Sequence, residues 1–228
     1  MTTSYHPISL SKALKSISVF DLDHTLLNCN SSFHFVLYLF KKKRLSLLKL
    51  LYVAGTYGWH KMGFTSLEGL YGALFKRILQ GKSSLELRDL AESFIAEHID
   101  TLLFQPLVDE LREAQKQGSY TVILSCSSDF LVAPIAAYMG FNEWGAVCYR
   151  EDGSKRYTEI SSMMAGQDKA NYVSSLIERF KISIEEVTAY TDSYLDLPLL
   201  YAVGEAVCVN PDKRLRKLAL KNCWKILN

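Results

Sequence analysis

One long block of the chain, residues 32 to about 104, has the spacing of helices and contains no proline. Within it, apolar residues recur every three or four positions, as on the buried face of an amphipathic helix. This periodicity predicts helices over residues 33–42, 45–57, 66–79 and 84–98. The rest of the chain must therefore fold around an all-helical insertion.

Outside the block, short apolar runs alternate with helical segments. Strands are expected over residues 17–20, 120–124, 144–149, 187–190 and 206–209. Helices are expected over residues 107–117, 129–139, 168–180, 196–203 and 212–220. This alternation predicts an α/β fold, a parallel sheet with helices on both faces. We expect a core domain of residues 1–31 and 105–228, and an inserted helical cap domain of residues 32–104.

The composition is typical of a globular, cytoplasmic protein. Of 228 residues, 49% are hydrophobic and 22% charged, and the formal net charge of +2 is too small to indicate a nucleic-acid partner. The five cysteines form no C-x-x-C pair, so we expect reduced thiols. Residues 1–11 lack the apolar run of a secretion signal, and no segment has the roughly 18 apolar residues of a membrane span.

Polar side chains stand where three predicted strands end. Asp21 and Asp23 follow the first strand, Ser125 follows the second, and Asp192 follows the strand over residues 187–190. In open α/β sheets, ligands bind beyond the carboxyl ends of the strands. The three strand ends therefore predict one binding site.

Asp21 and Asp23 form a D-x-D pair, and residues two apart in an extended chain point to the same side. Two carboxylates held close together repel each other, which a cation relieves. Oxygen ligands of this kind favour Mg²⁺, with Asp192 as a third candidate ligand. Aspartates are also common in ordinary solvated loops, so this interpretation depends on the other strand ends.

The same residues supply what phosphoryl transfer requires. Asp21 is the expected nucleophile and can form an aspartyl-phosphate. Asp23 can protonate the leaving oxygen and later activate water. Ser125 can hold a phosphate oxygen, and Lys169, at a predicted helix start, can pair with Asp21 and the phosphate.

Four segments resemble, in order, the motifs of the haloacid dehalogenase superfamily, in its phosphoserine-phosphatase-like branch (subfamily IB). They are FDLDHTL at 20–26, VILSCS at 122–127, Lys169, and YTDSYLDLPLL at 190–200. The resemblance covers nearly the whole chain. It implies a Rossmann-like core, a helical cap inserted after the first motif, and a phosphoric monoester hydrolase.

The resemblance also implies roles for single residues. Mg²⁺ would be held by Asp21, Asp192 and the backbone carbonyl of Asp23. Asp196 would support the site by holding Lys169 or a metal-bound water. Thr25 would shape the first loop and join Ser125 and Lys169 around the phosphate.

Four positions depart from the family pattern. His24 and Thr191 stand where many members have glycine, and Ser128 stands where the second motif often has proline. Phosphoserine phosphatases carry a glutamate, which binds the substrate amine, at the position of Asn30. A neutral amide cannot pair with an ammonium as a carboxylate does, so we expect a substrate other than phosphoserine.

The start of the block suggests a second hypothesis about the substrate. Apolar residues 33–40 and 45–53 flank a basic run at 41–44, a pattern that can lie in a membrane interface. That hypothesis predicts a peripheral membrane protein acting on a lipid phosphate. Two packed cap helices joined by a basic turn give the same pattern, and we favour them. The expected partner is then a small phosphorylated metabolite.

Other functions fit the sequence less well. A dehalogenase of the superfamily has no need for Asp23 or Mg²⁺. Cation-pumping ATPases have threonine at the position of Asp23 and need membrane spans, and this sequence has neither. A catalytically silent phosphate-binding module stays open as an alternative, although every expected catalytic residue is present.

Overall fold

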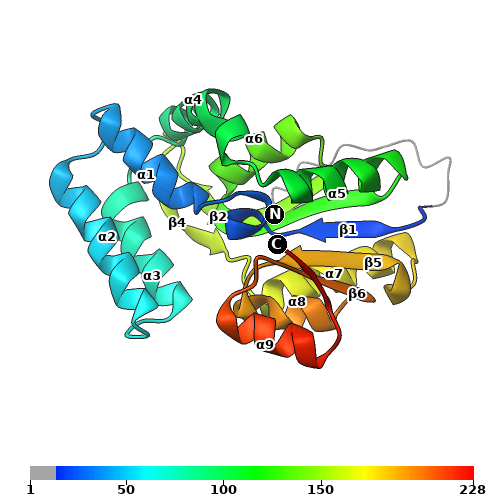
Figure 1. The fold of residues 1–228 in the computed structure, drawn as a ribbon. Coiled ribbons are helices and arrows are strands. Elements are labelled where there is room, and N and C mark those ends of the chain that lie inside the picture. The colour runs from blue at the N-terminus through cyan, green and yellow to red at the C-terminus, as the bar shows by residue number, and fades with distance from the viewer. Residues whose placement is uncertain (1–13) are drawn as a thin grey trace.

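The computed structural model describes residues 14–228, whose seven strands form one sheet in the order β4-β3-β2-β1-β5-β6-β7 (Figure 1). The strands are β1 (Ile17–Phe20), β2 (Tyr120–Ser128), β3 (Glu143–Glu151), β4 (Tyr157–Ser162), β5 (Val187–Thr191), β6 (Glu205–Val209) and β7 (Lys225–Leu227). Every neighbouring pair is parallel except β3 with β4. The predicted α/β class is confirmed, but β4, β7 and the antiparallel pair were not predicted.

Helices cover both faces of the sheet (Figure 1). On one face lie α5 (Gln105–Lys116) and α6 (Asp129–Met139); on the other lie α7 (Gln167–Phe180), α8 (Leu197–Tyr201) and α9 (Lys213–Lys221). Successive side chains of β1 point to opposite faces of the sheet, so this strand contributes to the core on both faces. Ile17 and Val19 join the core cluster that includes α7, α8 and α9, whereas Phe20 joins the cluster that includes α5 and α6.

The helical block between β1 and β2 consists of α1 (Ser31–Lys41), α2 (Leu47–Lys61), α3 (Leu67–Leu74), a π-helical turn (Phe75–Leu79) and α4 (Ser84–Leu102). The side chains that cap these helices set where they begin. Asn30, Ser46, Ser66 and Ser83 each accept a hydrogen bond from a backbone N–H of the first turn. The first helix therefore starts two residues before the predicted position.

The block is joined to the sheet by two connections that lie side by side. Leu27 and Leu103 form an antiparallel bridge, and Phe104 N donates to Leu26 O at 2.9 Å. The rings of Phe35 in α1 and Phe130 in α6 pack with centroids 5.8 Å apart. The α1 and α4 side of the block therefore shares a core with the sheet, while α2 and α3 lie at its outer end (Figure 1).

Among the described residues, no helix is long and apolar enough to cross a membrane. The expectation drawn from residues 1–11 lies outside the described part of the chain.

The carboxyl ends of β1 and β5 meet where the strand order reverses. Connections run from β1 to one side of the sheet and from β5 to the other, which is the usual position of a ligand site in open α/β sheets. Asp21 N donates to Tyr190 O at 2.9 Å, so the pairing of β1 with β5 extends to Asp21 itself. The fold thereby brings Asp21 and Asp192 to the same rim.

Candidate active site

The loop after β1 turns sharply around Leu22–Leu26, and Leu27 N closes the turn by donating to Leu22 O at 2.9 Å. His24 has a φ of 59°, in the left-handed region. Glycine adopts this conformation without steric cost, and histidine is among the side chains enriched there. The left-handed conformation of residue 24 therefore explains why the family pattern has glycine at this position and why histidine is tolerated there.

Lys169, in the first turn of α7, lies between two buried carboxylates. Its Nζ donates to Asp21 Oδ1 and to Asp196 Oδ2, each at 2.7 Å. Thr191 Oγ1 donates to the same Asp196 oxygen at 2.8 Å. Lys169 and Asp196 are almost inaccessible to solvent, with exposed fractions of 2% and 4%. Asp196 thus fixes the ammonium against Asp21.

Thr25 is fully buried and connects the first and last motifs. Its hydroxyl accepts a hydrogen bond from Asp192 N at 3.0 Å. The single hydroxyl hydrogen can be donated to Asp21 Oδ2 at 3.1 Å or to Asp192 Oδ1 at 3.2 Å. The hydroxyl is therefore already engaged with the two aspartates expected to hold Mg²⁺.

The carboxylate of Asp23 is held by donors from two distant segments. Ser31 N donates to Oδ1 at 2.7 Å, and Ser127 Oγ donates to Oδ2 at 2.6 Å. Asn30 Nδ2 adds a longer hydrogen bond of 3.3 Å to Oδ2. These contacts orient Asp23 apart from Lys169, so the two aspartates of the D-x-D pair have different partners.

Asn30 has two roles that the sequence did not reveal. Its Oδ1 accepts a hydrogen bond from Phe33 N at 2.8 Å and caps α1, while its amide nitrogen reaches Asp23. Both ends of the side chain therefore have a partner within the protein.

Ser125 lies in β2, which continues to Ser128 instead of ending at Leu124 as expected. The regular pairing with β3 shifts after Leu124, so the last residues of β2 depart from the parallel register. Ser125 is buried, and its Oγ accepts a hydrogen bond from Ser127 N at 3.0 Å. Within the described residues no acceptor takes the Ser125 hydroxyl hydrogen, which leaves it for an incoming oxygen.

The site holds more negative than positive side chains. The ammonium of Lys169 contacts Asp21 and Asp196, and Thr25 connects Asp21 to a third carboxylate, that of Asp192. Burial raises the pKa of Asp21 to about 6, with Lys169 opposing this and Asp196 adding to it. Burial and then Asp21 raise the pKa of Asp192 to about 8. Burial disfavours the charge of Lys169, but Asp196 and Asp21 outweigh it and raise its pKa.

The excess of buried carboxylate charge is the observation that fits a bound cation. Oxygen donors from Asp21 and Asp192 match the preference of Mg²⁺, which commonly takes one or two carboxylates and keeps several waters. In the described part of the chain, no group of three or more His, Cys, Asp or Glu side chains is arranged to hold a metal. A site of two carboxylates, one main-chain carbonyl and waters does not require such a group.

Three polar residues of the site were missed as functional candidates. Ser127 belongs to the second motif without an expected role, although it holds Asp23. Thr191 is noted in the sequence only as a departure from glycine, although it holds Asp196. Burial raises the pKa of the hydroxyl of Tyr71, in α3, and the charges of Cys126, Asp23 and Asp21 add to this effect. No local signal marks Tyr71, because only the fold of the block brings it there.

The sequence matches the haloacid dehalogenase-like hydrolase family over residues 18–201. It is 30% identical over 230 residues to the phosphoserine phosphatase SerB1 of Mycobacterium tuberculosis, covering 96% of this chain and 71% of that protein. It is 28% identical over 228 residues to the histidinol-phosphatase of Neisseria meningitidis serogroup C, covering 94% and 99%. A crystal structure of a Bordetella pertussis protein of unknown function has the same fold, with a TM-score of 0.84, 24% identity, and coverage of 94% of this chain and 99% of that one.

Proposed function

This chain belongs to the haloacid dehalogenase-like hydrolases, as a phosphatase of the phosphoserine-phosphatase-like branch, and we propose that it hydrolyses a phosphomonoester through an aspartyl-phosphate on Asp21. The observation that supports this best is the contact of Lys169 Nζ with Asp21 Oδ1 at 2.7 Å. The ammonium orients one oxygen of Asp21 and offsets its charge. The other oxygen, Oδ2, lies 3.1 Å from the Thr25 hydroxyl, and we propose that it attacks phosphorus.

Asp23 is the general acid and base of this proposal. A proton on its carboxyl group would pass to the leaving oxygen as the phosphorus–oxygen bond breaks. The resulting carboxylate would then take a proton from the water that hydrolyses the aspartyl-phosphate. Its hydrogen bonds to Ser127 and Ser31 N support this role, because they hold the carboxyl group in one orientation.

Ser125 and Lys169 are the proposed phosphate contacts. The Ser125 hydroxyl can donate to one phosphate oxygen, and the Lys169 ammonium can stabilise the charge that develops in the transition state. For Thr25 we propose a positioning role in place of the expected phosphate contact. Its hydroxyl already joins Asp21 to Asp192, and its side chain is fully buried.

We propose that Asp21, Asp192 and the main-chain carbonyl of Asp23 hold Mg²⁺. When bound, the cation would offset negative charge on the carboxylates and the phosphate. Asp196 supports the site by holding Lys169. We further propose that residues 32–104 form the cap that closes over the substrate, because the two connections of this segment lie side by side at Leu27 and Leu103.

The substrate is a phosphorylated small molecule, and we propose that it has no ammonium group. The names of the two relatives indicate phosphoserine and histidinol phosphate, which both carry an amine. Asn30 stands at the position of the amine-binding glutamate, and both ends of its amide are already bonded within the protein. A charged amine would therefore find no carboxylate there.

Hydrolysis of p-nitrophenyl phosphate with and without Mg²⁺ tests the proposal. We expect Mg²⁺-dependent activity in the wild type and a loss of at least about 10³-fold in Asp21→Asn. Asp89→Asn, at an exposed position of α4, is the matched control and should keep full activity. An inactive wild type that still binds Mg²⁺ and inorganic phosphate would favour the silent binding module instead.

A further inference from the structure

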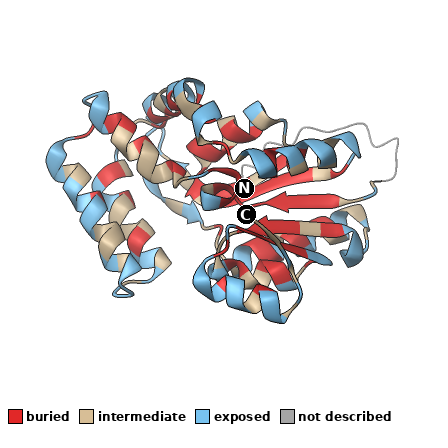
Figure 2. Cartoon of the chain, viewed as in Figure 1, coloured by how far each residue is buried: buried red, intermediate tan, exposed pale blue. Residues whose placement is uncertain are grey.

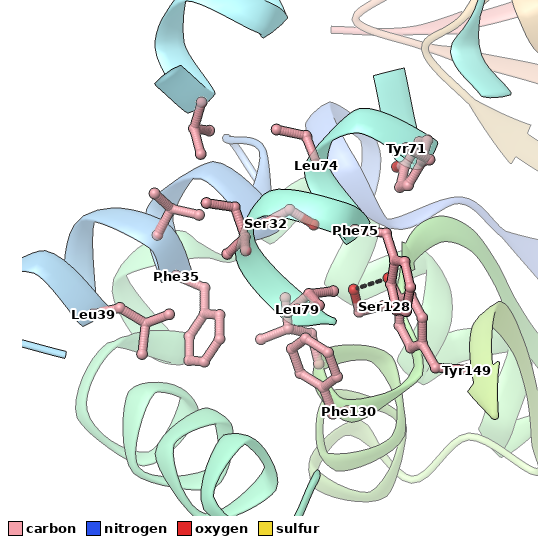
Figure 3. A pocket seen from close by; sticks show the side chains of 14 residues that line it. Ser32, Phe35, Leu39, Tyr71, Leu74, Phe75, Leu79, Ser128, Phe130 and Tyr149 are labelled. Atoms are coloured by element: carbon pink, nitrogen blue, oxygen red, sulfur yellow. Dashed lines mark hydrogen bonds between the residues drawn. The ribbon is translucent and has the colours of Figure 1, made fainter. Parts of the chain in front are cut away.

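A cavity of about 80 Å³ lies between the helical block and the carboxyl ends of the sheet (Figure 3). Ten of the side chains that line it are aliphatic or phenylalanine, and none is charged. They come from α1, α2, α3, the turn that follows α3, and α6. A cavity with such walls favours an apolar occupant over water.

One wall of the cavity is shared with the candidate active site. Ser32 lines the cavity, and its hydroxyl lies 2.9 Å from the hydroxyl of Ser127. Ser127 in turn donates to Asp23 Oδ2 at 2.6 Å. The cavity is therefore only two hydrogen bonds away from the proposed general acid.

Tyr71 gives the cavity a fourth polar side chain, beside Ser32, Ser128 and Tyr149 (Figure 3). Burial raises the pKa of its hydroxyl, and the charges of Cys126, Asp23 and Asp21 add to this effect. An occupant of the cavity would therefore lie beside Tyr71.

The remaining polar groups of the wall already have partners. Ser128 Oγ and Tyr149 Oη are 2.7 Å apart, as the dashed line in Figure 3 shows. A charged or strongly polar group that entered the cavity would lose its hydration without gaining a counter-charge.

We propose that this cavity binds the uncharged, apolar organic group of the substrate, while its phosphate lies at Asp21. This inference rests on the proposed phosphatase function and narrows it to alkyl phosphomonoesters. The volume is about half that of the roughly 150 Å³ cavity known to take up benzene, so it fits a group of a few carbons.

Hydrolysis of ethyl, butyl and hexyl phosphate measures the contribution of the cavity. These esters have leaving groups of similar basicity and differ in apolar length. We expect kcat/KM to rise about fourfold for each methylene that enters the cavity, and then to level off. Phosphoserine and ethanolamine phosphate, which are comparable in size to butyl phosphate but charged, should be poor substrates.

Val53→Phe fills the cavity from α2, and Ala54→Phe adds the same ring at the neighbouring, exposed position. Val53→Phe should reduce kcat/KM for butyl phosphate at least tenfold, chiefly through KM, and should reduce kcat/KM for ethyl phosphate much less, because two carbons occupy less of the cavity. Ala54→Phe should change neither. A circular dichroism spectrum like that of the wild type shows that the variant is folded.

The two proposals fail in different ways. If all three esters are hydrolysed with Mg²⁺ at equal kcat/KM, or if Val53→Phe slows them equally, the assignment of the cavity is wrong and the phosphatase proposal stands. If no phosphomonoester is hydrolysed, both are wrong.

A second inference concerns the outward face of α2. Leu48, Leu51, Trp59 and Met62 follow one another at helical spacing and are 80%, 59%, 53% and 64% exposed. Val53 is the only buried residue of the helix, and α2 lies at the outer end of the block (Figure 2). A soluble helix normally turns its apolar stripe toward a core, so this stripe lacks its covering within the described chain.

The charge around the stripe indicates what covers it. Residues 31–67 contain six Lys or Arg and no Asp or Glu. Lys42 and Arg44 pair with Glu97 and Glu86 of α4, at 3.0 and 3.3 Å. Lys41, Lys43, Lys49 and Lys61 lie outside these pairs. A second copy of the same surface would bring like charge against like, so self-association is disfavoured.

We infer that this face of α2 lies on an anionic lipid surface. Leucine, tryptophan and methionine would enter the interface while the lysines contact anionic headgroups. The surface is independent of the catalytic proposal, since none of its residues belongs to the active site.

Co-sedimentation with phosphatidylcholine vesicles, with and without phosphatidylglycerol, tests this surface. We expect binding to the anionic vesicles at low salt, its loss at high salt, and at least about a tenfold weakening in the double variant Leu48→Ser/Leu51→Ser. Leu85→Ser, at an exposed leucine of α4, should bind like the wild type. Absence of binding, or a dimer in light scattering that the double variant abolishes, would overturn the inference.

Discussion

Lys169 and Asp21 are 148 positions apart in the sequence, yet Lys169 Nζ lies 2.7 Å from Asp21 Oδ1 in the buried interior of the site. Burial of a single charge without a partner is costly, so each of these residues depends on the other and on Asp196. This dependence leads to predictions about both stability and activity.

Lys169→Met should reduce kcat by at least about 10²-fold, because the transition state loses a preorganised cation. It should also lower the free energy of unfolding by about 3–5 kcal/mol, since Asp21 and Asp196 would then face each other uncompensated. Steady-state kinetics and urea unfolding measure the two effects. Lys217→Met, at an exposed position of α9, is the control and should change neither.

Asp23→Asn should make the rate of hydrolysis depend much more strongly on the basicity of the leaving group. Without a general acid, hydrolysis of an alkyl phosphate should fall about 10²–10⁴-fold. p-Nitrophenyl phosphate needs little protonation of its leaving oxygen, so its first step should fall much less. Single-turnover rates for both esters give the ratio. Equal losses for the two would count against Asp23 as the acid.

Thr25→Val keeps the shape of the side chain but removes the hydroxyl that joins Asp21 to Asp192. We expect kcat to fall about tenfold to a hundredfold and half-maximal activation to need more Mg²⁺, because one hydrogen bond worth about 1–3 kcal/mol is lost. Thr25→Ser retains the hydroxyl and should recover most of both properties. Loss of phosphate affinity alone, with unchanged response to Mg²⁺, would instead favour the phosphate contact expected from the family.

Asp129, at the start of α6, gives a prediction about pH. Burial raises the pKa of its carboxyl group from 3.8 to about 6. The folded state therefore binds this proton more tightly than the unfolded chain does, so the contribution of Asp129 to stability declines as the pH rises from about 4 to 6. The free energy of unfolding of Asp129→Asn, minus that of the wild type, should therefore be larger at pH 7 than at pH 4. The expected increase is up to about 3 kcal/mol.

Chemical denaturation of Asp129→Asn and the wild type at both pH values measures this difference. Asparagine can still accept the hydrogen bond from Phe130 N, which is 2.8 Å long in the wild type. A difference between the two proteins that does not vary with pH would contradict the prediction.

The sequence predicted the parallel core well, because buried strands and amphipathic helices have clear periodicities. The helix over residues 129–139 agrees with α6 at both ends, where Gly140 adopts a φ of 71° and ends the helix. In contrast, the sequence does not predict β4, because only Tyr157 of its six residues is buried and no apolar alternation marks the strand. Its neighbouring turn contacts the helical block, where Ser84 N donates to Lys155 O, and such a long-range contact leaves no local signal.

For the candidate site, the sequence indicated the charged residues but not the hydroxyl groups that hold them. Asp21, Asp192 and Lys169 follow from strand ends and a helix start. Ser127 and Thr191 could not be identified in this way, because serine and threonine occur at many loop positions. Their roles depend on which carboxylate the fold places beside them.

Trapping of the intermediate tests the central claim most directly. The wild type is mixed with Mg²⁺ and p-nitrophenyl phosphate, quenched in acid and treated with borohydride, which reduces an acyl phosphate to an alcohol. Peptide mass spectrometry should then find homoserine at position 21 and aspartate at position 23, and no homoserine when substrate is omitted. Homoserine at another aspartate, or turnover at the wild-type rate by Asp21→Asn, would contradict the assignment of Asp21 as the nucleophile.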